Sequence, residues 1–290
     1  MALPTKDLDF DLKSLDFESK IKAKPEKKPQ FSVIYGKGGI GKSTMASYSP
    51  EPIIIPVGKE TGHERMCVPK FPTYAEMNLT PINHVYACMQ WILRAEHTRK
   101  TLIIDNVGSY REGVDEDVED SNKGVDLKAY GKGAAFGYPY WTRLLAGIDA
   151  VMKRRDMHVI LLGHDGSYNV NNPDGSYYQK ISINAPRGEN TNVMGLLEAR
   201  AHNVLYVKGE DQIIADKRGI VNKDGPVKKY ATSGATRRIV YTKPRGDFFA
   251  KSRVNMEEYY EIEQSETEEE LLHKRTNQTL IQLFTDLYHD

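Results

Sequence analysis

Residues 31–48 read FSVIYGKGGIGKSTMASY, and the expected architecture is built outward from this segment. Its first five residues form an apolar run that is typical of a buried strand. The next eight follow the pattern G-x-x-x-x-G-K-[ST], and Pro50 and Pro52 limit the helix that starts near Lys42. A strand, a glycine-rich loop and a helix in this order are the context that the pattern requires.

The physical chemistry of such a loop predicts a phosphate site. Glycines let backbone N–H groups approach phosphate oxygens closely, and the helix N-terminus adds a partial positive charge. Lys42 is expected to reach the β- and γ-phosphates, and Ser43 to hold Mg²⁺. The predicted cofactors are therefore ATP and Mg²⁺. The predicted nucleotide-binding residues are Gly36, Lys37, Gly38, Gly39, Ile40, Gly41, Lys42, Ser43 and Thr44.

Further strands and helices alternate along the chain. Apolar runs at 53–57, 101–105, 158–163, 203–209 and 237–243 predict strands, and helical spacing appears at 80–100, 141–155 and 191–200. This alternation predicts a parallel sheet with helices on its faces. Residues 111–135 are rich in acids and glycines and are expected to form a long loop, and 165–186 a loop or hairpin.

Asp105 ends the apolar run 101–105, where a metal-binding carboxylate is expected. A phosphate loop needs such an acid on a neighbouring strand to hold the water shell of the metal. The predicted metal ligands are Ser43 and Asp105.

Composition excludes several classes of protein. The 290 residues carry 40 Lys and Arg against 40 Asp and Glu, so the formal net charge is zero, and the mean hydropathy is −0.56. No apolar run approaches the ~20 residues of a membrane helix, and residues 1–20 do not resemble a signal peptide. Two cysteines exclude a disulfide scaffold. We expect a soluble cytoplasmic protein without a membrane partner.

The zero net charge is a sum of opposed blocks. Residues 217–253 hold 11 cations and 2 acids (net +9), whereas 256–290 hold 2 cations and 10 acids (net −8) and 111–126 hold 2 and 7 (net −5). Aromatic rings at Tyr230, Tyr241, Phe248 and Phe249 are interleaved with the basic block. Cations and stacking rings suit single-stranded nucleic acid; a basic solvated face is the alternative. The acidic segment 111–126 would repel DNA, bind a basic partner or stay solvated. The tail 256–290 would form an autoinhibitory or partner-binding helix that competes with DNA for the basic block, or a solvated helix packed on the core.

The sequence resembles two groups of P-loop proteins. IYGKGGIGKST (34–44) is similar to the deviant Walker A loop of the ParA/MinD group and the nitrogenase iron protein, whose signature lysine would be Lys37. That likeness covers about eleven residues and ends where Ser49-Pro50 interrupts the helix.

A second likeness extends over residues 31–255, to phage-encoded RecA-like ATPases that include single-strand annealing proteins. It lies in the order of five features along the chain: the phosphate loop, Lys59-Glu60-Thr61-Gly62, Val68-Pro69-Lys70-Phe71, Ile104-Asp105-Asn106, and Leu161-Leu162-Gly163-His164-Asp165. A late stretch with Arg238, Thr242, Pro244, Lys251 and Arg253 also fits. Gly58, where an acid is usual, and the acidic segment 111–126 depart from the pattern.

This second resemblance implies roles for particular residues. The catalytic residues would be Lys42, Glu60, Asp105 and His164, with Glu60 activating water and His164 sensing the γ-phosphate. The segment after His164 would bind DNA. Arg245, Lys251 and Arg253 would be candidates for a cation supplied to a neighbouring subunit's nucleotide, within a ring or filament.

The expected organisation is a flexible segment 1–29, a RecA-like P-loop NTPase core with a mostly parallel central sheet over 30–255, and an acidic helical tail over 256–290. The expected function is ATP-dependent binding of single-stranded DNA in recombination or replication, with a phage single-strand-binding or recombination protein as a possible further partner. Two alternatives stay open: a ParA/MinD-like ATPase switch, and a nucleotide-dependent protein-interaction module that does not bind DNA.

Overall fold

A computed structural model describes residues 16–21, 27–59, 61–64, 66–127, 132–188, 191–215, 220–222, 225–227, 230–263 and 277–288. The helices are α1 (Phe17–Lys20), α2 (Lys42–Ala46), α3 (Pro81–Arg94), α4 (Val107–Ser121), α5 (Lys132–Arg155), α6 (Val193–Arg200) and α8 (Gln278–Tyr288). The strands are β1 (Phe31–Gly36), β2 (Pro52–Pro56), β3 (Thr101–Asp105), β4 (His158–Gly163), β5 (Asp165–Asn171), β6 (Tyr177–Ile183), β7 (Asn203–Ala215), β8 (Ile220–Asn222), β9 (Gly225–Val227), β10 (Tyr230–Tyr241) and β11 (Tyr259–Glu263).

The central sheet has seven strands in the order β11-β10-β7-β1-β4-β3-β2. Strands β7, β1, β4, β3 and β2 pair in parallel, and β10 and β11 extend the sheet with antiparallel pairs. The expected α/β class with a mostly parallel central sheet flanked by helices is confirmed. All six residues of β1 are buried, because both faces of the sheet are covered.

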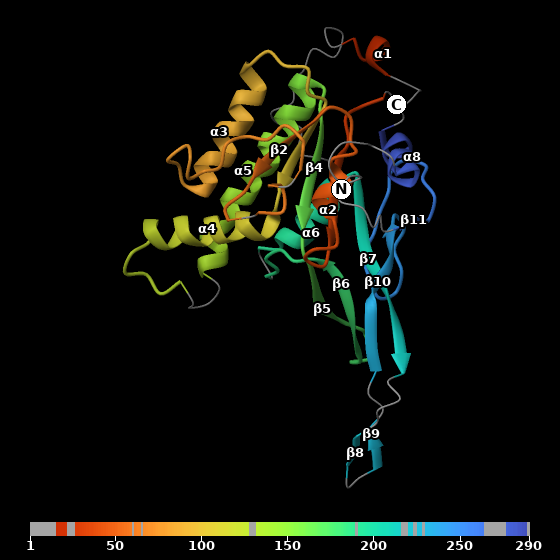
Figure 1. Ribbon diagram of the computed structural model, residues 1–290. Coiled ribbons are helices and arrows are strands. Elements are labelled where there is room, and N and C mark those ends of the chain that lie inside the picture. The colour runs from red at the N-terminus through yellow and green to blue at the C-terminus, as the bar shows by residue number, and fades with distance from the viewer. Residues whose placement is uncertain are drawn as a thin grey trace, which may run out of the picture.

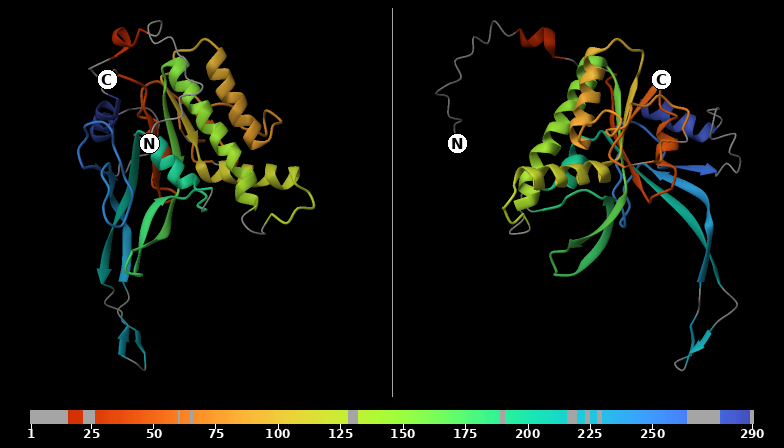
Figure 2. Two further views of the ribbon diagram at one scale, coloured as in Figure 1. Left: turned by 180° about the vertical axis from the view of Figure 1, so that it is seen from behind. Right: turned by 60° about the vertical axis from the view of Figure 1, so that its left-hand side comes forward.

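Two apolar clusters lie on opposite faces of the sheet. Val33 and Tyr35 of β1 belong to one cluster, with the buried faces of α3, α4, α5 and α6. Ile34 points to the other, with α2 and α8. Figure 2 shows α3, α4 and α5 on one side of the sheet and α2 and α8 on the other. Successive β1 side chains therefore anchor helices on both faces, which fixes the loop between β1 and α2.

Two antiparallel ribbons project beyond the carboxyl ends of the parallel strands (Figure 1). Strand β5 follows β4 after His164 and pairs with β6, so the expected hairpin is confirmed, with Gly175 in its turn at φ +85°. Strands β7 and β10 continue past their pairing with β1 and β11 and form the second ribbon, which carries β8 and β9. Both ribbons leave the sheet at the end where β1 runs into the phosphate loop.

The expectation of a long loop over residues 111–135 is wrong at both ends, because 111–121 belong to α4 and 132–135 belong to α5. Val107, Tyr110, Val114 and Val118 are spaced for one helical face and are buried, whereas most acids lie on the exposed face. The Asn106 side chain accepts a hydrogen bond from the backbone N–H of Ser109 at 3.1 Å and caps the helix. Dense acids and Gly113 concealed this apolar period in the sequence.

The expected helical tail is also partly wrong. Residues 259–263 form β11, which pairs with β10 because Tyr260 and Ile262 alternate into the buried face. Helix α8 packs onto the core through Leu283, Phe284 and Leu287. Of the segment expected to be flexible, residues 16–21 and 27–29 are described and contain α1. No helix in the described part of the chain has both the length and the apolarity of a bilayer-crossing segment.

Candidate nucleotide-binding site

The loop between β1 and α2 has the backbone of a phosphate cradle. Gly39 and Gly41 have φ of +74° and +90°, values that a residue with a Cβ rarely adopts. Helix α2 begins at Lys42, so its first N–H groups open toward the loop. The predicted order of strand, glycine-rich loop and helix is confirmed. It could be predicted because the phosphate-loop pattern depends on eight contiguous residues.

The Lys42 side chain is held inside the loop. It is buried, and its ammonium donates hydrogen bonds to the backbone oxygens of Gly36 at 3.0 Å and Lys37 at 2.8 Å. The cation is therefore placed at the centre of the cradle, where phosphate oxygens would compete for it. The Lys37 side chain, in contrast, is exposed.

Ser43 and Asp105 meet at the first turn of α2. The Ser43 hydroxyl donates to Oδ2 of Asp105 at 2.7 Å, and Asp105 is buried at the end of β3. The expectation that this strand neighbours β1 is wrong, because β4 lies between β1 and β3. The Asp105 carboxylate instead reaches Ser43 across the carboxyl end of β4. A hydroxyl and a carboxylate side by side are the hard oxygen ligands that Mg²⁺ prefers, so these residues fit the ion.

His164 lies between the loop and the start of α4. A Cβ placed on Gly38 would lie 3.6 Å from His164 Cε1, and one on Gly108 would lie 3.8 Å from Cδ2. The histidine thus contacts the phosphate loop on one side and leads directly into β5 on the other. Its expected place at the end of β4 is what the structure shows; its sensing role stays a prediction.

The remaining expected site residues are either outside the described residues or apart from this cluster. Glu60 lies outside the described residues, as do Lys217, Arg218, Lys223, Lys228 and Lys229 of the basic block. Lys251 and Arg253 donate to the carbonyl of Ala199 at the end of α6, beside the start of β7. They are at the opposite end of the parallel strands from the phosphate loop.

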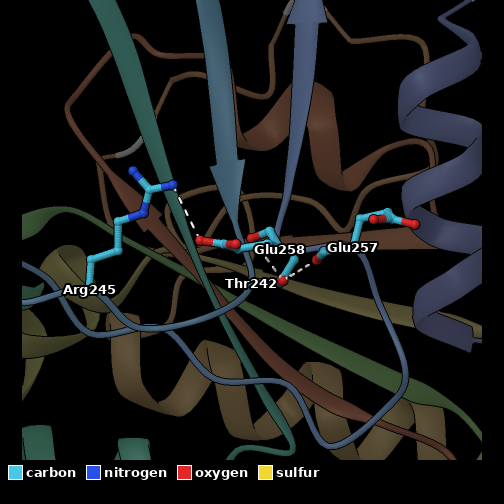
Figure 3. A network of polar contacts seen from close by, with 4 residues as sticks. All are labelled: Thr242, Arg245, Glu257 and Glu258. Carbon is cyan, nitrogen blue, oxygen red and sulfur yellow. Dashed lines mark hydrogen bonds and ion pairs between the residues drawn. The ribbon is translucent and has the colours of Figure 1, made fainter.

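Arg245 is held within its own chain, as Figure 3 shows. Its guanidinium lies 3.3 Å from Glu258 Oε1 and stacks over the Tyr241 ring at 4.7 Å. The hydroxyl of Thr242 donates to the backbone oxygens of Glu257 and Glu258, which ties the end of β10 to the start of β11. A role for Arg245 at a neighbouring subunit stays a prediction, and it would have to break these contacts.

Two of the rings expected to stack on bases are core residues. Tyr241 and Phe248 are 7 % and 2 % exposed, and both pack against Tyr206. Tyr241 faces Tyr206 across the β7–β10 pair, and Tyr206 faces Tyr35 across the β7–β1 pair. The sequence could not show this, because adjacency across a sheet is set by register.

Arg238 belongs to the basic block and to the late stretch of the RecA-like resemblance, but its place beside the phosphate loop was not predicted from the sequence. A Cβ on Gly41 would lie 2.4 Å from Nη1 of this arginine. Residues 41 and 238 are brought together only by the order and register of the strands, so no local pattern signals the contact.

The model of a family described as an AAA domain matches residues 28–254. The chain belongs to this AAA domain family. Its P-loop and AAA domain indicate a nucleotide-binding ATPase architecture. No curated protein matches the sequence.

One solved structure that is similar to the AAA-domain chain is the crystal structure of the RadB recombinase. The two share 11 % sequence identity at a TM-score of 0.39. The likeness covers 87 % of this chain and 93 % of that one.

Proposed function

We propose that this AAA-domain protein is a RecA-like ATPase that hydrolyses Mg²⁺-ATP and binds single-stranded DNA through the β5–β6 hairpin. One observation carries the proposal: the hairpin starts directly after His164, whose ring lies against Gly38 of the phosphate loop. A change in the bound phosphates that moves His164 would therefore also move the start of the hairpin.

A second contact ties the hairpin to the strand that enters the loop. The Tyr35 hydroxyl donates to the backbone oxygens of Phe249 at 2.5 Å and Ile181 at 3.3 Å. Ile181 is on β6, and Tyr35 directly precedes Gly36. Both strands of the hairpin are thus attached to residues next to the phosphate loop.

The hairpin has the surface chemistry of a single-strand binder. Tyr177 and Tyr178 are 67 % and 42 % exposed. Lys180 lies over the Phe249 ring at 5.7 Å, and Arg187 lies over the Tyr168 ring at 4.3 Å. Exposed rings stack on bases of any sequence, and cations neutralise phosphates.

In this function Lys42 would bind the β- and γ-phosphates, while Ser43 and Asp105 would hold Mg²⁺, which neutralises charge on the phosphate oxygens when bound. His164 would contact the γ-phosphate and change its position when that group leaves. Glu60 is proposed as the water-activating carboxylate. Self-association into a ring or filament, and a role in phage recombination or replication, belong to the same proposal and rest on the motif order.

The test is the ATPase rate with and without single-stranded DNA. We expect DNA to stimulate the wild-type rate, Lys42→Ala to abolish hydrolysis, and His164→Ala to keep ATP binding but lose the stimulation. Unchanged hydrolysis in Lys42→Ala would exclude the loop as the site. Stimulation that survives in His164→Ala would contradict the proposed link.

Lys37→Ala separates this function from a ParA/MinD-like switch. A lysine that acts across a dimer is essential there, so the variant would be inactive. In the present proposal the loop uses only the backbone of Lys37, whose side chain is exposed, and we expect hydrolysis to persist. If the wild-type protein binds no single-stranded DNA at low salt, the protein-interaction alternative is favoured.

A further inference from the structure

Arg238 reaches the phosphate loop because of the register of the extended strands. Val207 pairs with Gly36 at the end of β1, and Gly209, two residues further along β7, pairs with Arg238 of the antiparallel β10. Arg238 therefore lies just beyond the carboxyl end of β1, where the phosphate loop begins. Val240 packs in the same apolar cluster as α2, and residues 238 and 240 share one face of the strand, so Arg238 faces the α2 side.

The guanidinium occupies the space beside Gly41. Its Nη1 would lie 2.4 Å from a Cβ at this position, a distance that real side chains do not tolerate. Gly41 thus supplies the φ of +90° that the loop needs, and the end of the flexible Arg238 side chain lies where a Cβ would be.

None of the described residues neutralises the charge of Arg238. The side chain is half-buried, and burial lowers the pKa of its guanidinium from the usual value, although an arginine stays protonated in a protein. Across the part of the chain that the structure describes, no ion pair or hydrogen bond joins Arg238 to a carboxylate. Its neighbour Arg237 instead lies 3.8 Å from Glu261. A half-buried cation at a phosphate loop is stabilised when an anion binds there.

We propose that Arg238 binds the α- and β-phosphates of the nucleotide from within the same subunit. The side of the loop on which Arg238 lies decides which phosphates it can reach. Strands β7 and β10 flank β1 on one side, whereas β4 and β3 lie on the other. His164 and Asp105 follow or end these two strands and, in the proposed function, would contact the γ-phosphate and hold the metal. Arg238 is therefore a binding residue for ATP and ADP alike. This inference rests on the proposed nucleotide-binding function.

The experiment measures equilibrium binding of ATP and ADP, with Mg²⁺ and without DNA, to wild-type protein and to Arg238→Gln. We expect about ten- to a hundredfold weaker binding of both nucleotides, the usual effect of losing a hydrogen bond to a charged group. Arg237→Gln is the matched control, since it removes the same charge from the opposite face of β10, and we expect a change of less than about twofold, as for an exposed ion pair.

Three results would overturn the inference: unchanged affinity for both nucleotides, a loss restricted to ATP, or an equal loss in Arg237→Gln. If Arg238→Gln unfolds, Arg238→Met keeps the apolar stem without the charge and repeats the test on a folded protein. A wild-type protein with no DNA-stimulated hydrolysis but Arg238-dependent ADP binding would contradict the proposed function alone. Full ATPase activity with unchanged affinity in Arg238→Gln would contradict this inference alone.

Discussion

At Gly36 a single hydrogen atom in place of a side chain allows β1 and β7 to pair beside the phosphate loop. A Cβ at this position would lie 2.3 Å from the backbone oxygen of Val207. Neither atom can move without disturbing the β1–β7 pairing, because Val207 is the partner of Gly36 in the ladder.

We therefore expect Gly36→Ala to lower the free energy of unfolding by about 1–3 kcal/mol, the usual cost of overpacking a filled site. Urea unfolding followed by circular dichroism measures this change. Gly246→Ala is the control, because no atom lies within 4 Å of its added Cβ. Equal stability of the two variants would show that β7 shifts without cost.

At the scale of single elements, α8 is part of the core. The sequence left open an autoinhibitory or partner-binding helix in the acidic tail, which would compete with DNA for the basic block. Leu283 and Leu287 are fully buried, and Tyr260 of β11 donates to Asp286 of α8 at 2.5 Å. A helix with this apolar face against the sheet loses the hydrophobic contribution of that face if it detaches.

Leu283→Ala is expected to destabilise the protein by about 2–5 kcal/mol, as for other fully buried leucines. Gln278→Ala, at an exposed position of the same helix, should change stability by less than about 0.5 kcal/mol. Thermal and urea unfolding distinguish the two. A Leu283→Ala protein with wild-type stability and higher affinity for DNA would instead support a detachable, inhibitory helix.

The β5–β6 hairpin is the element on which the DNA proposal depends most. Tyr177→Ala removes its most exposed ring, and we expect about five- to a hundredfold weaker binding of a poly-dT oligonucleotide, the effect of losing one stacked base. Fluorescence anisotropy measures the affinity. Tyr259→Ala removes another exposed tyrosine, from β11, and is expected to bind as the wild type does. Equal losses in both variants would place the DNA elsewhere.

At the scale of the whole molecule, the acidic segment 111–126 lies apart from the basic block. Acids of the segment 256–290, in contrast, meet the basic block in the ion pairs Arg237–Glu261 and Arg245–Glu258. Figure 1 shows α4 and the β7–β10 ribbon at opposite sides of the molecule. Most of the acids on α4 are exposed. Both ribbons leave the sheet at the carboxyl ends of the parallel strands, where the phosphate loop lies. Lys251 and Arg253 lie at the other end, beside the start of β7, where they donate to backbone oxygens at the end of α6. A zero net charge is therefore compatible with a local basic surface.

Salt should weaken DNA binding if a local basic surface contacts the phosphates of the DNA. For about three phosphate contacts the slope of log K against log salt is about −2 for a single strand. Titrations at several salt concentrations measure it, with double-stranded DNA of the same length as a comparison. A slope near zero would mean that DNA contacts are not ionic and would favour the protein-interaction alternative.

Local sequence predicted those features that contiguous residues create. The loop after β1, the parallel strands and the hairpin after His164 follow from apolar periodicity and turn residues, which act over a few positions. Predictions became unreliable where this signal was masked, as in α4 with its dense acids, or where one strand in a charged segment was read as helix, as in β11. Both elements are held by burial of one face against the sheet.

The sequence by itself determined the phosphate loop, because the glycines of residues 36–41 and the lysine and serine that follow build it from their own backbone and side chains. Only the tertiary structure decided what surrounds it. Asp105 reaches Ser43 across β4, Tyr241 and Phe248 are buried, and Arg238 lies on Gly41. These contacts join residues up to about two hundred positions apart, and strand order and register, which no local pattern encodes, bring them together.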